Sequence, residues 1–159
     1  MPVTNASDYE RWPNLPAMFF ERAHELDARP LFWAKKEGRY APLSWRDAAA
    51  QANALARGLR ALGIAPGERV ALISENRPEW GVADVAIMAA GALTVPAYTT
   101  NTTRDHRHVL IDSGASAAIV STPRLAARVL PAVLQSPALK FVVGIERIRE
   151  HEGTSVKLF

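Results

Sequence analysis

The fold is decided by residues 69–97, which read RVALISENRPEWGVADVAIMAAGALTVPA. Two short apolar runs, residues 70–74 and 93–97, flank a segment whose apolar side chains recur at helical spacing. Asn76 and Glu79 match a helix-capping pair, and the proline between them falls in the first turn, where its missing N–H costs little. The stretch therefore predicts one strand–helix–strand unit.

The same alternation extends in both directions along the chain. A helix is predicted over residues 44–63, because Ser44 and Asp47 resemble a capping box. Thr102 and Asp105 are expected to cap a further helix that closes at Gly114. The remaining predicted elements are a strand at 117–121, a helix at 122–134 and a strand at 141–145.

The strands begin about every 24 residues, and one helix separates each from the next. Their sequences are continuously apolar, which is typical of strands that are buried on both faces. Right-handed crossovers would place helices on both sides of such a sheet. The predicted fold class is therefore α/β, with a mostly parallel sheet between two helical layers.

The two ends of the chain extend this unit. A helix is predicted at residues 14–27, and strands at 31–34 and 40–43 flank a polar turn as a β-hairpin. After the polar stretch 146–153, the last residues, 156–159, are expected to enter the sheet as a strand with nothing after it to cover it. We expect residues 1–159 to be one truncated unit without an internal boundary.

The composition excludes several classes of protein. Hydrophobic residues make up 48% and charged residues 22% of the 159, which is ordinary for a globular protein. No apolar stretch approaches the roughly 18 residues of a membrane span, and residues 1–9 lack a secretory pattern. There is no cysteine, hence no disulfide framework and no thiolate metal site. These features favour the cytoplasm.

The basic charge does not indicate a nucleic-acid partner. The net charge is +3, from 19 basic and 16 acidic residues. The arginines lie singly between acidic and apolar residues, and no basic run with interleaved aromatics occurs. We therefore expect a solvated, arginine-rich surface and no nucleic-acid binding.

The usual catalytic and binding motifs fail on this sequence. The glycines fit neither the dinucleotide fingerprint nor the nucleoside-triphosphate lysine loop. A third class of protein, a flavodoxin-like cofactor binder, is therefore disfavoured, because it would need such a phosphate-binding loop. His106 and His108 are two residues apart on a helix and so face away from each other; we expect two surface histidines and no metal site. Trp80 and Met88 are expected to pack in the core. No nucleophile or general base is predicted.

Several segments nevertheless resemble one family, the adenylate-forming (AMP-binding) enzymes, and most closely the bacterial long-chain fatty acid–CoA ligases. Trp45 and Asp47 stand where the family's first core motif usually has tyrosine and glutamate. The segments occur in the family's order across residues 40–145. They are LSWRDA at 43–48, GERVA at 67–71, SENRPEW at 74–80, AAGALTVP at 89–96 and IDSGA at 111–115.

The resemblance implies a parent enzyme that uses ATP and magnesium to make an acyl-adenylate from a fatty acid, and then transfers the acyl group to coenzyme A. In the family, the phosphate-gripping loop and the catalytic lysine follow the region matched here. The resemblance therefore implies the incomplete N-terminal part of the adenylate-forming fold. No catalytic residue is expected in this chain, and the chain alone is expected to be inactive.

One binding site is implied within the chain. Arg124 and Arg128 lie where some relatives place arginines that hold the nucleotide phosphate of coenzyme A. Arginine suits phosphate through paired donors, and a helix N-terminus adds a favourable dipole. Arginines one turn apart also fit an ordinary solvated helix face. The loop 98–101 follows a strand end, a position that suits either function or packing.

Two hypotheses about the whole protein stay open at this point. In the first, the chain is part of a ligase, with the rest of that enzyme as its partner and with fatty acid, ATP and coenzyme A as substrates. In the second, it is a stand-alone interaction or regulatory module without catalysis, and its exposed last sheet edge pairs with another chain or a second copy. A parent enzyme that acts on fatty acids can also work at the membrane periphery, although no amphipathic anchor is evident.

Overall fold

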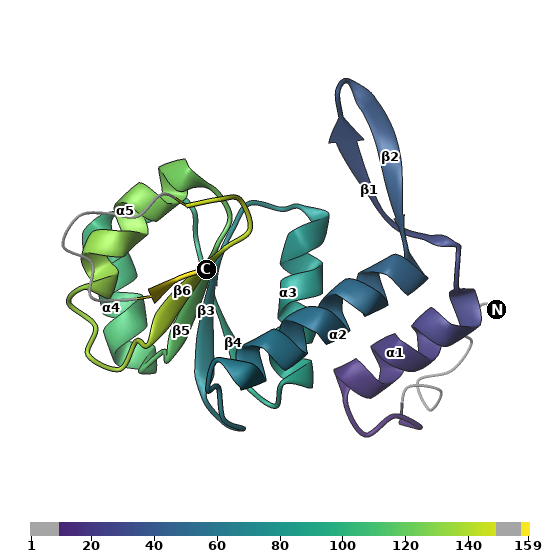
Figure 1. Cartoon of the computed structure of the whole chain (residues 1–159), viewed down its shortest axis with the longest axis horizontal. Helices are drawn as coiled ribbons and strands as arrows, with labels where there is room; N and C mark the ends of the chain where they lie inside the picture. The colour runs from purple at the N-terminus through teal and green to yellow at the C-terminus, as the bar shows by residue number, and fades with distance from the viewer. Residues whose placement is uncertain (1–9, 149–156) are drawn as a thin grey trace.

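A computed structural model describes residues 10–148 and 157–159. Each helix and strand predicted in these ranges is present, with ends that differ by one or two residues. The expectation for residues 1–9 lies outside the described residues. The elements (Figure 1) are α1 (Leu15–Leu26), β1 (Pro30–Lys36), β2 (Arg39–Ser44), α2 (Trp45–Ala61), β3 (Arg69–Ile73), α3 (Pro78–Ala89), β4 (Leu93–Ala97), α4 (Thr103–Ser113), β5 (Ala117–Val120), α5 (Pro123–Val133), β6 (Phe141–Gly144) and β7 (Lys157–Leu158).

Five strands form one parallel sheet in the order β4-β3-β5-β6-β7. In the middle of β3, Ala71 pairs with Val95 of β4 on one side and with Ala118 of β5 on the other. The predicted parallel sheet is thus confirmed. The expected last strand is also present, as the short β7 beside β6.

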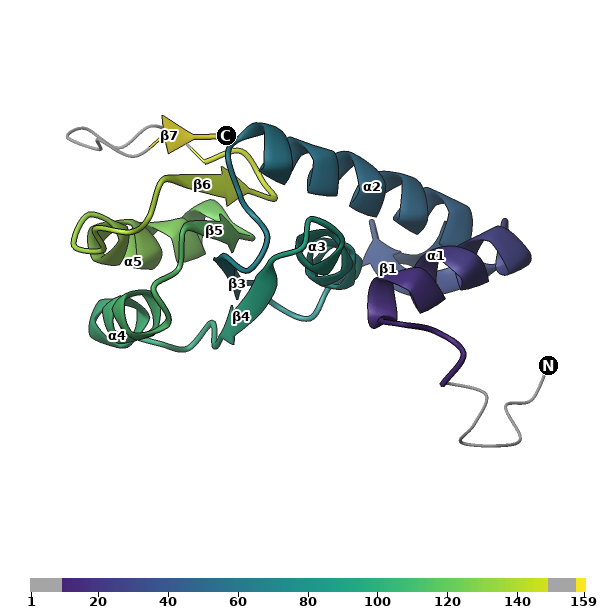
Figure 2. The ribbon, with the colours of Figure 1, turned by 90° about the horizontal axis from the view of Figure 1, so that it is seen from below.

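The two faces of the sheet are covered by different helices (Figure 2). Val70 and Leu72 of β3 point into a core that α2 and α3 cover. Ala71 and Ile73 point into a second core, covered by α4 and α5. Successive strand residues alternate between faces, so a strand buried on both sides has to be apolar throughout. We refer to this sheet with α2–α5 as the α/β sandwich.

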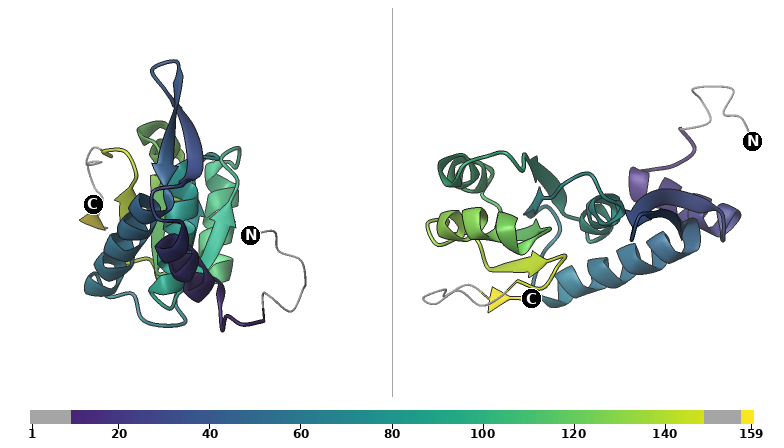
Figure 3. Two further views of the ribbon diagram at one scale, coloured as in Figure 1. Left: turned by 90° about the vertical axis from the view of Figure 1, so that its right-hand side faces the viewer. Right: turned by 90° about the horizontal axis from the view of Figure 1, so that it is seen from above.

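The segments before α2 form an arm on the sandwich. Helix α1 packs against α2 and α3, and the antiparallel hairpin β1–β2 rises away from the helices (Figures 1 and 3). Phe32 at the base of the hairpin lies against Gly81 of α3, where an added Cβ would come within 2.8 Å of the end of the Phe32 ring. Glycine at this position lets the aromatic ring approach the helix closely.

Two of the three predicted N-terminal helix caps are present in the structure. The Ser44 hydroxyl accepts a hydrogen bond from the Asp47 N–H, and Thr102 with Asp105 forms the complete predicted capping box. The Asn76–Glu79 pair was wrong. The capping position of α3 is Arg77, whose side chain makes no cap bond, because a guanidinium has only donors and cannot accept from a backbone N–H. It donates to the Glu79 carboxylate at 2.9 Å.

At the amino ends of the strands, one carboxylate connects three segments. The Glu68 carboxylate accepts hydrogen bonds from the Lys140 ammonium at 2.7 Å, the Ser116 hydroxyl at 2.8 Å and the Ala65 N–H at 2.7 Å. These bonds, led by that of Lys140, lower the pKa of Glu68 to about 2. The turn before β3 is thereby fixed to the starts of β5 and β6.

None of the helices in residues 10–148 combines the length and the apolar character needed to span a lipid bilayer.

Candidate functional site

The candidate site lies at the carboxyl edge of the parallel sheet. Because β3, β4 and β5 run in the same direction, the residues after each strand meet at one edge. Polar side chains follow immediately: Ser74 and Glu75 after β3, Thr99 after β4, and Ser121 and Thr122 after β5. Ligands of open α/β sheets bind at this edge, so the arrangement marks the place to look for a site.

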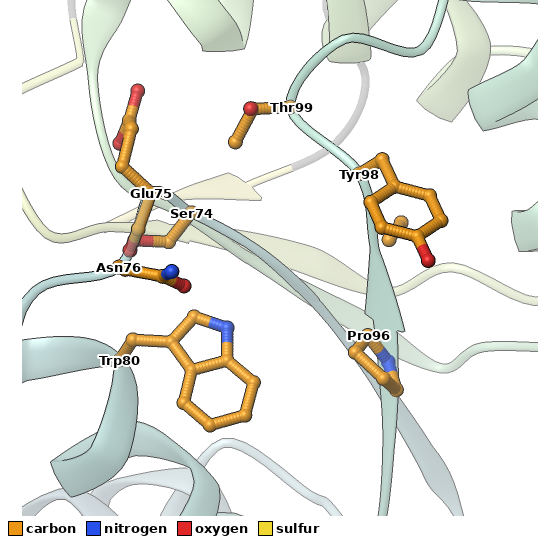
Figure 4. Close-up of a pocket in the computed structure, with 8 residues that line it drawn as sticks. Ser74, Glu75, Asn76, Trp80, Pro96, Tyr98 and Thr99 are labelled. Atoms are coloured by element: carbon orange, nitrogen blue, oxygen red, sulfur yellow. The ribbon is translucent and has the colours of Figure 1, made fainter.

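A pocket of about 550 Å³ opens at this edge between β3 and β4 (Figure 4). Trp80 from the first turn of α3, Pro96 from β4 and Tyr98 from the following loop form its apolar wall. Ser74, Glu75, Asn76 and Thr99 supply its polar groups. A pocket with an apolar wall and a few convergent polar groups is suited to a small organic ligand.

The pocket changes the assignment of Trp80. Its side chain packs partly against the core, as predicted from its helical spacing, and it also borders the open pocket. Tyr98 is 80% exposed, so the loop after β4 presents its ring to solvent instead of burying it. The sequence signal for this site was the position of the loop 98–101 directly after a strand.

Glu75 is held in place inside the site. The buried Ser121 hydroxyl donates to Oε2 of Glu75, and the Ser74 hydroxyl donates to the Glu75 backbone carbonyl at 2.9 Å. The bond from Ser121 is the main cause that lowers the pKa of Glu75 below its usual value. The carboxylate therefore stays ionised at neutral pH, and one oxygen is already committed to the protein.

Arg77, which directly follows the pocket residue Asn76, forms an ion-pair bridge. Its guanidinium donates to Glu79 at 2.9 Å and to Glu146, after β6, at 2.8 Å. Both carboxylates raise the pKa of Arg77. The bridge fixes the start of α3 to the segment after β6, so we assign Arg77 a positioning role.

A smaller pocket of about 190 Å³ continues from the first and shares Glu75 and Thr99 with it. Arg124 and Arg128, the two arginines singled out in the sequence, line this pocket together with Thr122 at the N-terminus of α5. Both arginines are exposed, and Arg128 donates from Nη1 to the Thr99 carbonyl at 3.4 Å. The structure thus places Arg124 and Arg128 in the same small pocket. Their role in binding coenzyme A stays a prediction.

His106 corrects one expectation. It is only 1% exposed, and within the described residues neither ring nitrogen has a hydrogen-bond partner. Burial lowers the pKa of His106, so the ring is neutral at physiological pH. The prediction of a surface residue was wrong because α5 packs over this face of α4; His108 is exposed as predicted.

No group of three or more His, Cys, Asp or Glu side chains in the described ranges is arranged to hold a metal ion. The two arginines of the smaller pocket do fit an anionic group, because they are exposed donors at one end of a helix.

Comparison with known proteins identifies the family and agrees with the fold. Residues 8–157 match the model of a family described as AMP-binding enzyme. The chain belongs to this family. Within this family, the chain is 36% identical over 132 residues to "Long-chain-fatty-acid--CoA ligase FadD15" of Mycobacterium tuberculosis, a match that covers 83% of this chain and 22% of that protein. It is 27% identical over 135 residues to human "Long-chain-fatty-acid--CoA ligase ACSBG1", covering 82% and 19%.

Solved structures show the same architecture. Coronafacic acid ligase from Pectobacterium brasiliense superposes on 90% of this chain and 27% of its own, with a TM-score of 0.76 at 17% identity. A benzoate CoA ligase from Burkholderia xenovorans LB400 gives a TM-score of 0.72 at 25% identity, over 84% and 26%. The predicted adenylate-forming fold is confirmed. The chain spans about a fifth of the length of the curated relatives it matches.

Proposed function

We propose that this chain is the N-terminal part of an enzyme that activates a long-chain fatty acid with ATP and transfers it to coenzyme A, with AMP and pyrophosphate as the other products. The observation that carries the proposal is the 36% identity to FadD15 over 83% of the chain. A benzoate CoA ligase with the same fold supports acid–thiol ligation in general. Magnesium, ATP and the fatty acid are assigned to the whole enzyme.

The smaller pocket is the proposed contact with coenzyme A. Two exposed guanidinium groups share it, and Thr122 caps α5 at the same point by accepting from the Leu125 N–H. Arginine binds phosphate through paired, charge-assisted hydrogen bonds. The ionised Glu75 also lines this pocket and repels an anion, so a phosphate is expected next to the arginines and away from this carboxylate. This is consistent with the 3′-phosphate of coenzyme A.

The activity is tested on the product of the natural reading frame, read through Phe159. That protein is incubated with ATP, magnesium, palmitate and coenzyme A, and palmitoyl-CoA, AMP and pyrophosphate are measured. We expect all three in equal amounts. A stop codon directly after Phe159 would instead favour the stand-alone module. The 159-residue chain by itself is expected to release no pyrophosphate above background, and clear turnover would overturn that part of the proposal.

The pocket is tested separately. Arg124→Ala and Arg128→Ala are each expected to raise the KM for coenzyme A about tenfold in the active enzyme, through loss of a charged phosphate contact. Dephospho-CoA, which lacks the 3′-phosphate, is the matched substrate, and its KM should be the same in all variants. Arg107→Ala removes an exposed arginine from α4 and serves as the control. If the arginine variants raise the KM for coenzyme A and for dephospho-CoA equally, the arginines do not bind the 3′-phosphate.

A further inference from the structure

The hairpin β1–β2 has one covered face and one open face. By strand alternation, Trp33, Lys35, Tyr40 and Pro42 share one side, since Trp33 pairs with Pro42 and Lys35 with Tyr40. We call this set the outer hairpin face. Trp33 is 58% and Tyr40 71% exposed, whereas Phe32 and Leu43 on the opposite side are half-buried. The exposed apolar residues are therefore adjacent, and they lie on the part of the molecule that rises farthest from the sandwich (Figure 3).

The outer hairpin face has the character of an interface that another polypeptide segment covers. Single exposed apolar residues are ordinary, but two large aromatic residues and a proline on neighbouring strands form a patch of the kind that marks an interface. The outer edges of β1 and β2 also remain open, because among the described residues these strands pair only with each other. A two-stranded hairpin is marginally stable without further strands or a packed face.

The uncovered surface extends along the arm. An open groove of about 610 Å³ lies between α1 and α3, with Leu15, Phe20 and Met88 among its lining residues. Leu15 is itself exposed. In contrast, β3 and β5 of the sandwich are buried on both faces. The arm thus carries uncovered apolar surface, whereas the central strands of the sheet are covered on both faces.

The length of the relatives indicates which polypeptide covers the outer hairpin face. The chain spans about a fifth of the curated proteins it matches, and about a quarter of the benzoate CoA ligase that shares its fold. We propose that the outer hairpin face is an internal interface of the larger enzyme. Polypeptide that follows Phe159 adds a strand to an open edge of the hairpin and packs apolar side chains over Trp33 and Tyr40. The inference rests on the proposed function only for the existence of that larger enzyme.

Cysteine labelling tests this directly, because the 159-residue chain has no cysteine. Trp33→Cys and Tyr40→Cys are made in this chain and in the product of the natural reading frame, and labelling by a thiol reagent is followed by peptide mass spectrometry. We expect labelling at least tenfold slower in the longer protein. Leu134→Cys, at the exposed C-cap of α5, is the control and should label at similar rates in both.

Three outcomes would overturn the inference. Equal labelling of Trp33→Cys in both proteins would show that the outer hairpin face stays open. Protection in the 159-residue chain that grows with concentration, together with a dimer by light scattering, would assign the face to a second copy. A reading frame that ends at Phe159 would leave no occupant. Because labelling does not depend on turnover, an inactive long protein that protects both sites contradicts the proposed function and supports the interface.

Discussion

The central strands of the α/β sandwich and the hairpin of the arm contain similar side chains, but only the central strands are covered on both faces. In β3 and β5 the apolar residues alternate between two helical layers and are buried on both. In the hairpin, Phe32 and Leu43 face the core while Trp33 and Tyr40 face solvent. Burial of apolar area supplies most of the stability of a fold. The stability of this chain should therefore reside in the sandwich.

The largest expected difference between the two regions comes from replacing one large side chain in each of them by alanine. Leu72→Ala, at a fully buried position of β3, should cost about 3 kcal/mol in the free energy of unfolding, because it leaves a cavity between packed layers. Trp33→Ala in the 159-residue chain should cost less than about 1 kcal/mol, since its ring is mostly in solvent. Urea denaturation followed by circular dichroism measures both. Equal losses would mean that the arm is as well covered as the sheet.

The second prediction concerns the carboxylate at the amino edge of the sandwich. Glu68→Gln should cost about 1–2 kcal/mol at pH 7, because half-exposed Lys140 lets water screen part of the pair. The folded-state pKa of Glu68 is lowered to about 2, so its contribution is complete above its ordinary pKa of 4.5. It is lost as the pH falls from 4.5 through 2. Glu21→Gln, in an exposed ion pair of the arm, is the control and should change stability little.

The third prediction uses the buried histidine. Burial lowers the pKa of His106, with neighbouring Arg128 acting in the same direction and Asp105 against it. The unfolded chain therefore binds a proton near pH 6.5 while the folded chain does not, and stability falls as the pH drops below that value. His106→Leu should remove most of this slope and add about 1 kcal/mol at pH 5, since it replaces an unpaired buried polar ring.

Thermal unfolding at pH 7.5 and pH 5 measures the effect. His108→Leu, at an exposed position on the same helix, should leave the slope as it is in the parent chain. If His106→Leu keeps the same slope, the histidine has a polar contact in solution that compensates its charge.

The smallest predicted effect tests how the arm is attached. Gly81→Ala places a methyl group 2.8 Å from the tip of the Phe32 ring, so the ring has to move. The overall melting temperature should change little, whereas amide hydrogen exchange in the hairpin should become several-fold faster. Gly58→Ala on α2 has open space around its Cβ and should instead stabilise the chain by about 0.5–1 kcal/mol. Unchanged exchange in Gly81→Ala would mean that Phe32 does not hold the hairpin.

The sequence predicted the sandwich well because the relevant signals are local. Continuous apolar runs, the Thr102–Asp105 capping box and the helix closing at Gly114 all depend on neighbouring residues, and each is present in the structure. The Asn76–Glu79 pair fitted the same pattern and failed, because the helix begins one residue later and Arg77 takes the capping position. His106 failed for another reason: its burial depends on α5, a separate element that packs over it.

For the candidate site, the sequence alone predicted its most general property, a mostly parallel sheet with the loop 98–101 directly after one of its strands. It also singled out Arg124 and Arg128. Strand order decided the rest, because it brings the segment after β3 next to the loop after β4 and the start of α5. Periodicity is set within a few residues, whereas side chains that meet across strands are chosen by packing of the whole sheet. The two joined pockets and the fixed Glu75 therefore belong to the tertiary structure.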